Sequence, residues 1–249
     1  MLFRDNLCLA VDGADFERVQ RVARDFRGCT TTIKLGPAFL LTWGLYGVRG
    51  LGELGMRDII LDARLFGHHQ EIWTAVTEAA KLPGIAGIVV QSICGTELLT
   101  LAVEAADKSR DYSQRINTPK IIGAAVPAAF NAAVMRQSRI DLKTRFDFVC
   151  QQAIICHSAG VHAMIVEYED IPHVKRVCPD LPLLVNIRRR VESYEVAISP
   201  EEQSQPGPYE VMLAGAAHAI LAMELIGHDA EWCADMVAKE LAKLQWSQK

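Results

Sequence analysis

The stretch IILDARLFGHH, residues 59–69, places an acid and a guanidinium two residues apart, where an apolar run gives way to polar residues. Because alternate side chains of an extended chain point to the same side, Asp62 and Arg64 are expected to face the same way. A carboxylate can orient a substrate or repel its negative charge, and a guanidinium can supply fixed positive charge. The pair marks either a catalytic floor or a surface ion pair.

Other polar or functionally distinctive residues also stand where apolar runs end. Besides Asp62 and Arg64, these are Asp12, Lys34, Gln91, Glu167, Asn186 with Arg188, and Gly215. If the runs are parallel strands, their carboxyl ends meet at one edge, and a barrel gathers these side chains around one mouth. For any one of them, a solvated loop position remains the alternative.

The apolar runs recur about every thirty residues and predict the fold. They cover residues 7–11, 31–35, 58–63, 87–91, 120–126, 162–167, 181–187 and 209–215. Amphipathic segments such as 14–26 and 229–245 separate them and predict helices. Eight such units predict a (β/α)₈ TIM barrel, with residues 1–249 as a single domain. A doubly wound open sheet is the alternative, weakened because the turn VDGADF lacks the G-x-G-x-x-G pattern.

Composition limits the partners and the compartment. The chain has 26 basic and 30 acidic residues, a net charge of −4, so no overall field attracts nucleic acid or an anionic membrane. No apolar run reaches the ~18 residues that a membrane span needs. The seven cysteines include no C-x-x-C pair, which favours reduced thiols in a cytoplasmic protein. The histidine and cysteine spacing does not predict a transition-metal site.

Three strand motifs carry a resemblance to a known family. LCLAVD, TIKLGPAFL and IILDARL resemble the opening strands of the orotidine 5′-phosphate decarboxylase superfamily, and the order stays similar through GAAHAIL. The resemblance implies a cofactor-free carboxy-lyase of pyrimidine biosynthesis, acting as a homodimer on a phosphorylated nucleotide or sugar. It places Asp12 and Lys34 at the ribose. It makes Asp62 the first acid of the family's Asp-x-Lys-x-x-Asp signature.

The chain departs from this signature at catalytic positions. It reads Asp62-Ala63-Arg64-Leu65-Phe66-Gly67, with Arg64 in place of the catalytic lysine and Gly67 in place of the second acid. A guanidinium holds its protons, so Arg64 supplies charge but is a poor proton donor. Loss of a general acid typically costs ~10²–10⁴-fold in rate. Weak or changed decarboxylase activity is therefore expected.

The phosphate grip is also altered. The family's Gly-Arg after the last strand maps onto Gly215 and Ala216, so we expect the Gly215 amide at a helix start and Arg188, from the run IRRRV, to hold phosphate instead. A solvated arginine run is the alternative. Gln203 and Gln205 are similar to the family's phosphate-covering glutamine. The long connection 188–208 lies at the face where barrels do chemistry, where loops of that length are often lids, and 107–119 is a second long connection.

Two other functions remain open. One is a regulatory or binding barrel that kept the nucleotide site and lost its proton donor. The other is the metal-dependent sugar-phosphate lyase branch of the same superfamily, which carries a glutamate where this chain has Lys34; Glu167 and Asp62 keep it open. The resemblance further predicts that the homodimer persists through the helix after the third strand, without the acid contact that Gly67 removes.

Overall fold

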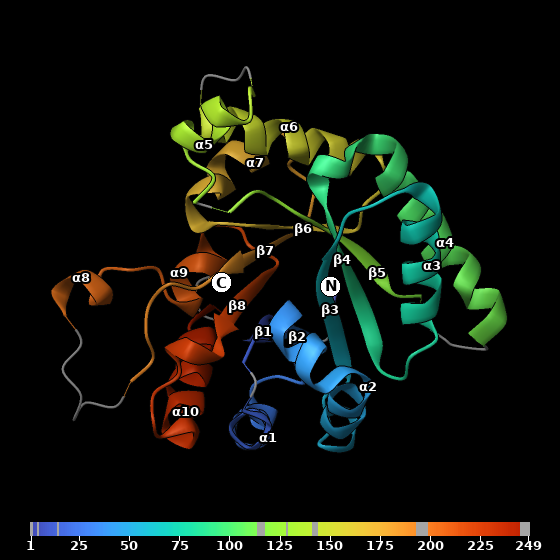
Figure 1. Ribbon diagram of the computed structural model, residues 1–249. Helices are drawn as coiled ribbons and strands as arrows, with labels where there is room; N and C mark the ends of the chain where they lie inside the picture. Colours follow the sequence, from blue (N-terminus) through green and yellow to red (C-terminus); the bar gives the residue numbers. More distant parts are fainter. Residues whose placement is uncertain are drawn as a thin grey trace.

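Eight parallel strands close into a barrel in the computed structural model (Figure 1), which describes residues 2–3, 5–13, 15–113, 118–127, 129–140, 144–192 and 199–244. The strands pair in chain order, and β1 closes on β8 with Leu7 opposite Ala219. This closure confirms the predicted TIM barrel and excludes the open sheet. The strands are β1 (Leu7–Val11), β2 (Thr32–Leu35), β3 (Asp58–Leu65), β4 (Ile85–Gln91), β5 (Lys120–Ala124), β6 (Ala163–Val166), β7 (Leu183–Asn186) and β8 (His218–Ala222).

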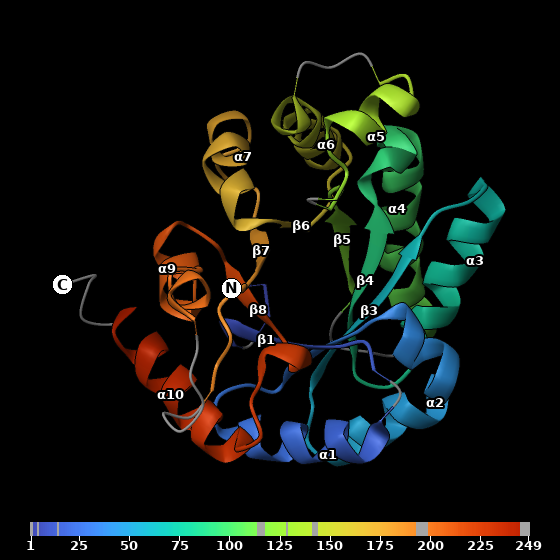
Figure 2. The ribbon, with the colours of Figure 1, turned by 60° about the vertical axis from the view of Figure 1, so that its left-hand side comes forward.

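Helices surround the barrel (Figure 2). The helices are α1 (Phe16–Asp25), α2 (Pro37–Glu53), α3 (His69–Ala80), α4 (Gly95–Ser113), α5 (Ala132–Gln137), α6 (Arg145–Ser158), α7 (Ile171–Val177), α8 (Pro200–Gln203), α9 (Pro208–Leu213) and α10 (Ala230–Ala242). The predicted stripe of α1 is buried, because Phe16, Val19 and Val22 all face the core. α1 and α10 lie side by side, which brings the two ends of the barrel wall together.

One predicted strand is wrong. Residues 209–215 do not form the eighth strand, because Pro208–Leu213 is helix α9 and the strand is His218–Ala222. Pro208 occupies the first turn of α9, where a proline fits a helix best. Gly215 follows the helix with a φ of 104°, the left-handed conformation that ends helices.

Two layers of apolar side chains form the core. The outer layer lies between the strands and the helices, as parallel strands require. The inner layer fills the barrel and consists of Phe3, Cys8, Ile60, Val89, Ile122, Ala124, Ala163, Ile165, Leu184 and Ile220. Phe3 closes the amino-terminal end against His218, with ring centroids 5.2 Å apart. Side chains thus fill the barrel interior, and the end that is left open to a ligand is the carboxyl end of the strands.

The two long connections contain more regular structure than the sequence suggested. Most of 107–119 belongs to α4, which runs to Ser113, and 114–117 lie outside the described residues. The connection 188–208 contains α8, and 193–198 are not among the described residues, so the lid stays a prediction. All seven cysteines carry free thiols. None of the described helices has the length and apolar character needed to traverse a bilayer.

Candidate functional site at the barrel mouth

Lys34 and Asp62 meet inside the carboxyl end of the barrel. Lys34 is in register with Ile60, an inner-layer residue, and Asp62 lies two residues further along β3. The Lys34 Nζ donates to Asp62 Oδ2 at 2.5 Å, and the side chains are only 12% and 2% exposed. The other carboxylate oxygen, Oδ1, is buried and accepts no hydrogen bond from any residue that the structure describes. Such an orphaned acceptor at a barrel mouth is a position for a ligand's hydroxyl or N–H group.

Arg64 reaches the same carboxylate through an irregular backbone. Its Nε lies 3.5 Å from Asp62 Oδ1, close enough for charge attraction but without hydrogen-bond geometry. The pairing of β3 with β4 slips between Leu61 and Leu65, so β3 bulges here. Arg64 itself has a φ of 45°, a left-handed conformation that costs on the order of 1–2 kcal/mol for a residue other than glycine. The bulge and not simple alternation therefore aims Arg64 at Asp62.

Asp12 lies beside the start of α2. Its Oδ1 accepts a hydrogen bond from the Ala38 N–H at 2.7 Å, which places a negative charge at the positive end of that helix. Gly36 makes this approach possible, because a Cβ there would lie 2.5 Å from the Asp12 Cγ. Asp12 thus caps a helix at the rim. No hydrogen bond or ion pair joins it to Lys34 among the described residues.

The position of the family's second acid is filled from the next helix. A Cβ on Gly67 would lie 2.3 Å from Glu71 Oε2, the oxygen that accepts from the His68 N–H at 2.7 Å. Glu71 therefore caps α3 with a carboxylate that occupies the space of a side chain at residue 67. An aspartate at position 67 would displace it.

A small cavity lies at the mouth, between the carboxyl ends of β3, β5, β6 and β7. It is lined by Arg64, Ala125, Val126, Pro127, Ile165, Val166, Glu167 and Asn186, and its volume is about 20 Å³. Arg188 stands at its edge, with NH2 3.2 Å from Glu167 Oε2 and NH1 2.6 Å from Glu169 Oε1. Two carboxylates therefore compensate the guanidinium that was predicted to hold phosphate.

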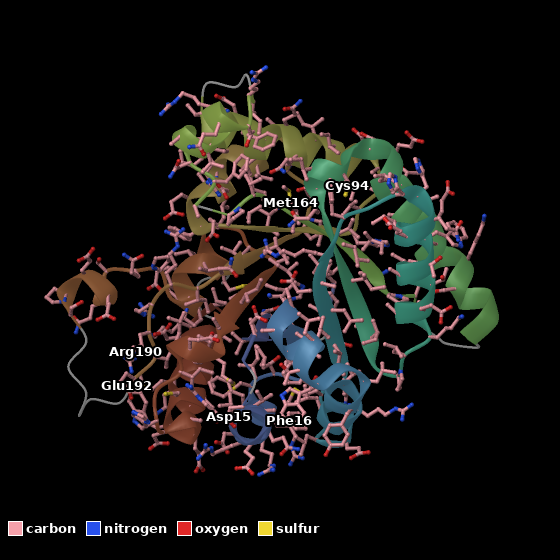
Figure 3. All side chains as sticks on the ribbon, viewed as in Figure 1. Asp15, Phe16, Cys94, Met164, Arg190 and Glu192 are labelled. Carbon is pink, nitrogen blue, oxygen red and sulfur yellow. The ribbon has the colours of Figure 1, made fainter. Side chains whose placement is uncertain are left out.

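The other two arginines of the run IRRRV point away from this cavity. Arg189 NH2 lies 2.5 Å from Glu240 Oε1 on α10, and its NH1 is 3.3 Å from Glu210 on α9. Arg190 pairs with Glu192 at 3.0 Å; Figure 3 labels both beside α10. The run is consequently neither a solvated face nor a single phosphate grip.

Gly215 is not part of the mouth. It follows α9 and precedes β8, so it lies at the amino end of the last strand, opposite the candidate site. Its prediction as a helix-opening phosphate ligand is wrong, because the eighth strand was placed one element too early. The carboxyl end of β8 is Ala222, followed by the turn Met223–Leu225, labelled η4. The phosphate-gripping Gly-Arg pair of the family has no counterpart there, since the residues are Ala222 and Met223.

Sequence reasoning missed the carboxylates that hold Arg188. Glu167 was considered as a strand end and as a metal ligand but not as a partner of Arg188, and Glu169 was not singled out. The signal was present, since Glu167, Glu169 and Asp170 make an acidic turn after β6, next to β7 in the barrel. Of that turn, Asp170 is fully buried and forms a bidentate pair with Arg145 at the start of α6.

Comparisons with known proteins show which proteins this chain resembles. No family model matches the chain. The orotidine 5′-phosphate decarboxylase of Geobacter sulfurreducens is 24% identical over 178 residues, 71% of this chain and 72% of that protein. The Geobacter metallireducens enzyme is 22% identical over 218 residues, 88% of this chain and 87% of its own. The orotidine 5′-phosphate decarboxylase structure from Lactobacillus acidophilus has a TM-score of 0.75 at 15% identity, covering 95% of this chain and 98% of that one.

The resemblance to the orotidine 5′-phosphate decarboxylase superfamily is confirmed. The chain is a divergent relative of these decarboxylases. Its differences from the superfamily signature fall on the mouth itself, at Arg64 and Gly67, while Lys34 and Asp62 keep their places.

Proposed function

We propose that the chain binds a phosphorylated nucleotide or sugar at the barrel mouth and acts as an orotidine 5′-phosphate decarboxylase-like carboxy-lyase with an altered catalytic set. The observation that carries this proposal is the buried carboxylate of Asp62. One oxygen is held by Lys34, and the other has no hydrogen-bond donor among the described residues and faces Arg64 at 3.5 Å. A substrate donor would satisfy that oxygen, and the two cations would receive the substrate's negative charge.

The mouth residues divide the reaction between them. Asp62 orients the substrate and repels its carboxylate, which favours departure of that group as CO₂. The C–C bond's electron pair stays on the ring carbon, where the fixed charge of Arg64 stabilises it. The carbanion then takes a proton from water, because the Arg64 guanidinium holds its protons, and the lack of a positioned ammonium at this carbon makes the step slow. Asp12 accepts from a ribose hydroxyl at the rim.

Phosphate binding is the weak step of this arrangement. Arg188 would have to exchange Glu167 or Glu169 for the phosphate, because both carboxylates lie within 3.2 Å of it. Each exchange leaves a carboxylate to be solvated again, which reduces the net gain of the new ion pair. Low substrate affinity therefore accompanies the altered catalytic set.

The direct test is CO₂ release from orotidine 5′-phosphate at millimolar concentration. We expect slow release that Asp62→Ala abolishes and that Arg64→Lys raises, because lysine restores a proton donor. Arg139→Lys is the matched control: Arg139 has a φ of 53° and is exposed, so the same change of side chain is made away from the mouth. No release from folded protein would contradict the decarboxylase proposal.

Restoring both missing residues of the family's Asp-x-Lys-x-x-Asp signature requires a third substitution. Gly67→Asp alone would collide with Glu71, so the test variant is Arg64→Lys with Gly67→Asp and Glu71→Ala. A larger rate for this triple variant than for Arg64→Lys would mean that the inherited geometry is intact. An equal rate would mean that residue 67 does not address the reacting group.

A nucleotide-binding barrel without turnover is the second candidate. It is favoured by the guanidinium of Arg64, which holds its protons where the superfamily uses a lysine. This candidate predicts a rise in melting temperature with uridine 5′-monophosphate and no CO₂ release. A metal-dependent reaction is less well supported, because the Lys34 ammonium already occupies the side of Asp62 that a cation would take.

A further inference from the structure

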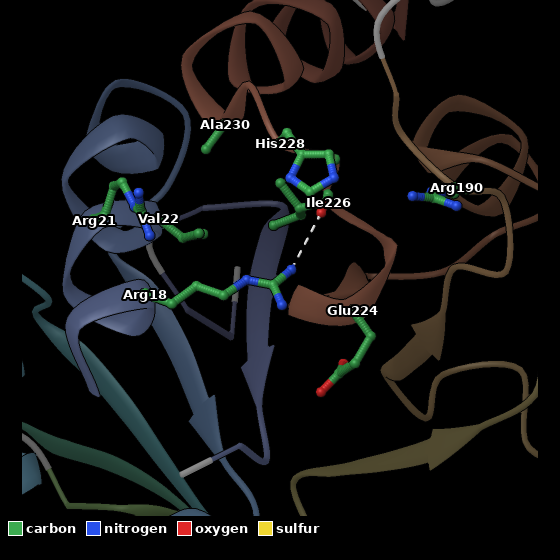
Figure 4. A pocket seen from close by; sticks show the side chains of 9 residues that line it. Arg18, Arg21, Val22, Arg190, Glu224, Ile226, His228 and Ala230 are labelled. Atoms are coloured by element: carbon green, nitrogen blue, oxygen red, sulfur yellow. Dashed lines mark hydrogen bonds between the residues drawn. The ribbon is translucent and has the colours of Figure 1, made fainter. Parts of the chain in front are cut away.

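A second cavity lies outside the mouth, between α1 and the turn after β8 (Figure 4). Its volume is about 420 Å³, and we call it the α1 cleft. Its lining consists of Arg18, Arg21, Val22, Arg190, Glu224, Ile226, Gly227, His228 and Ala230. It shares no lining residue with the mouth cavity. Small-molecule sites commonly measure ~300–1,000 Å³, so the cleft has room for a small ligand.

Hydrogen bonds hold the walls of the cleft in place. On one side, Val191 N donates to Leu225 O at 2.8 Å, and Gly227 N donates to Val191 O at 2.9 Å. On the other side, Arg18 NH2 reaches the carbonyls of Met223 at 3.3 Å and Ile226 at 3.4 Å. The segment after β7, the turn after β8 and helix α1 are thus joined around one preformed hollow.

The cleft is cationic. Three guanidinium groups line it against one carboxylate, that of Glu224. Arg18 and Arg21 stand three residues apart on α1, a spacing that puts both on one face of the helix. The Arg18 NH2 group donates to uncharged backbone carbonyls. Arg21 has no hydrogen-bond or ion-pair partner in the part of the chain that the structure describes.

Arg190 adds an unused donor. Its NH2 pairs with Glu192, whose side chain is 1% exposed, and its buried Nε has no hydrogen-bond partner in the described ranges, which omit 193–198. A buried guanidinium N–H without an acceptor is uncommon in folded proteins and is usually satisfied by a ligand or water. The cleft therefore combines excess positive charge with a lining arginine that keeps one N–H unpaired within the described part of the chain.

We propose that the α1 cleft is a second ligand site, which binds a small polyanion through a phosphate or diphosphate group. Arginine recognises phosphate oxygens with paired N–H donors, and the imidazole of His228 offers a further donor at the rim. Nucleic acid fits poorly, since apart from His228 the lining has no aromatic ring on which a base could stack. Because Arg190 follows β7 and the turn follows β8, a ligand here lies against two segments that also border the mouth.

The test is titration calorimetry of the full chain with inorganic diphosphate. Arg21→Gln should weaken binding about tenfold, the loss expected for one charge-assisted contact. The matched control is Arg24→Gln, because Arg24 is an exposed arginine on the same helix that does not line the cleft. The control should keep the affinity of the unmodified chain within about twofold, and so should Asp62→Ala, since Asp62 belongs to the mouth.

The results of these titrations distinguish binding at the cleft from nonspecific binding, and they distinguish a free diphosphate from an organic phosphate ester. Equal weakening by Arg21→Gln and Arg24→Gln would overturn the proposal, since it would mean nonspecific attraction to α1. Absence of binding to both diphosphate and glycerol phosphate would also overturn it. Tighter binding of diphosphate assigns the cleft to a free diphosphate, and tighter binding of glycerol phosphate assigns it to an organic phosphate ester. Failure of CO₂ release at the mouth affects none of these results.

Discussion

The ion pair of Lys34 and Asp62 gives the sharpest prediction for stability. At 12% and 2% exposure, neither charge can be solvated fully if its partner is removed. Breaking a buried pair by removing one partner typically costs ~3–5 kcal/mol, and the partial exposure of Lys34 lowers our expectation to about 2–3 kcal/mol. For a domain of this size each kcal/mol lowers the melting temperature by ~2–4 °C. Lys34→Met and Asp62→Asn should therefore each lower it by roughly 4–12 °C.

A double-mutant cycle isolates the pairwise energy. Lys34→Met with Asp62→Asn removes both charges, so the double variant should be less destabilised than the sum of the single variants by about 2 kcal/mol. Urea unfolding of the four proteins, followed by circular dichroism, measures this difference. Lys81 and Glu78 supply the control, since their ion pair has the same 2.5 Å separation but is 55% and 62% exposed. Its coupling should be only ~0.3–0.5 kcal/mol.

Additive effects would refute this reasoning. If each single variant at the mouth costs less than about 0.5 kcal/mol and the double variant equals their sum, the charges are solvated and the mouth is not a closed charged site. A mouth coupling equal to that of Lys81 with Glu78 would lead to the same conclusion.

Three further predictions follow from packing, burial and exposure. Gly36→Ala should lower the stability by ~1–3 kcal/mol in urea unfolding, because its Cβ would displace Asp12; an unchanged midpoint would contradict the contact. Burial raises the pKa of Cys8 and Cys156 from 9.0 to about 12, so above pH 9 the unfolded thiols ionise while the folded ones stay protonated. Stability should then fall by about 1.4 kcal/mol per pH unit for each of these two thiols, and Cys8→Ala should make the slope of the unfolding midpoint between pH 9 and 11 shallower; an unchanged slope would refute this. Phe66 is 70% exposed beside α3, so if that helix carries the predicted homodimer interface, Phe66→Asp should convert dimer to monomer in light scattering; a monomeric unmodified chain would remove the dimer proposal.

Seven of the eight predicted strands are confirmed, because each carries a β-branched or apolar run. The eighth strand, HAILA, is short and contains two alanines and a histidine, which are weak strand signals. The preceding YEVML is apolar enough to be mistaken for a strand. Pro208 and Gly215 were readable as start and stop signals of a helix, and weighing them first would have moved the carboxyl end of the last strand to Ala222.

The candidate site was predicted in part. Lys34, Asp62 and Arg64 come together because neighbouring strands of a barrel end at the same edge. The bulge in β3 and the left-handed backbone of Arg64 were beyond prediction, since no glycine marks them. The pairing of Arg188 with Glu167 and Glu169 depends on loop geometry after β6 and β7, which periodicity does not describe.

The central claim is that Asp62, with Lys34 and Arg64, forms the floor of a nucleotide-phosphate site. The most direct test of this claim is a calorimetric titration of the unmodified chain and of the Asp62→Ala variant with uridine 5′-monophosphate. Saturable binding by the unmodified chain, weakened at least tenfold by Asp62→Ala and unchanged by Arg24→Gln, is the predicted result. Equal affinity of the unmodified chain and Asp62→Ala, or no heat of binding at millimolar nucleotide or sugar phosphate, would contradict the account.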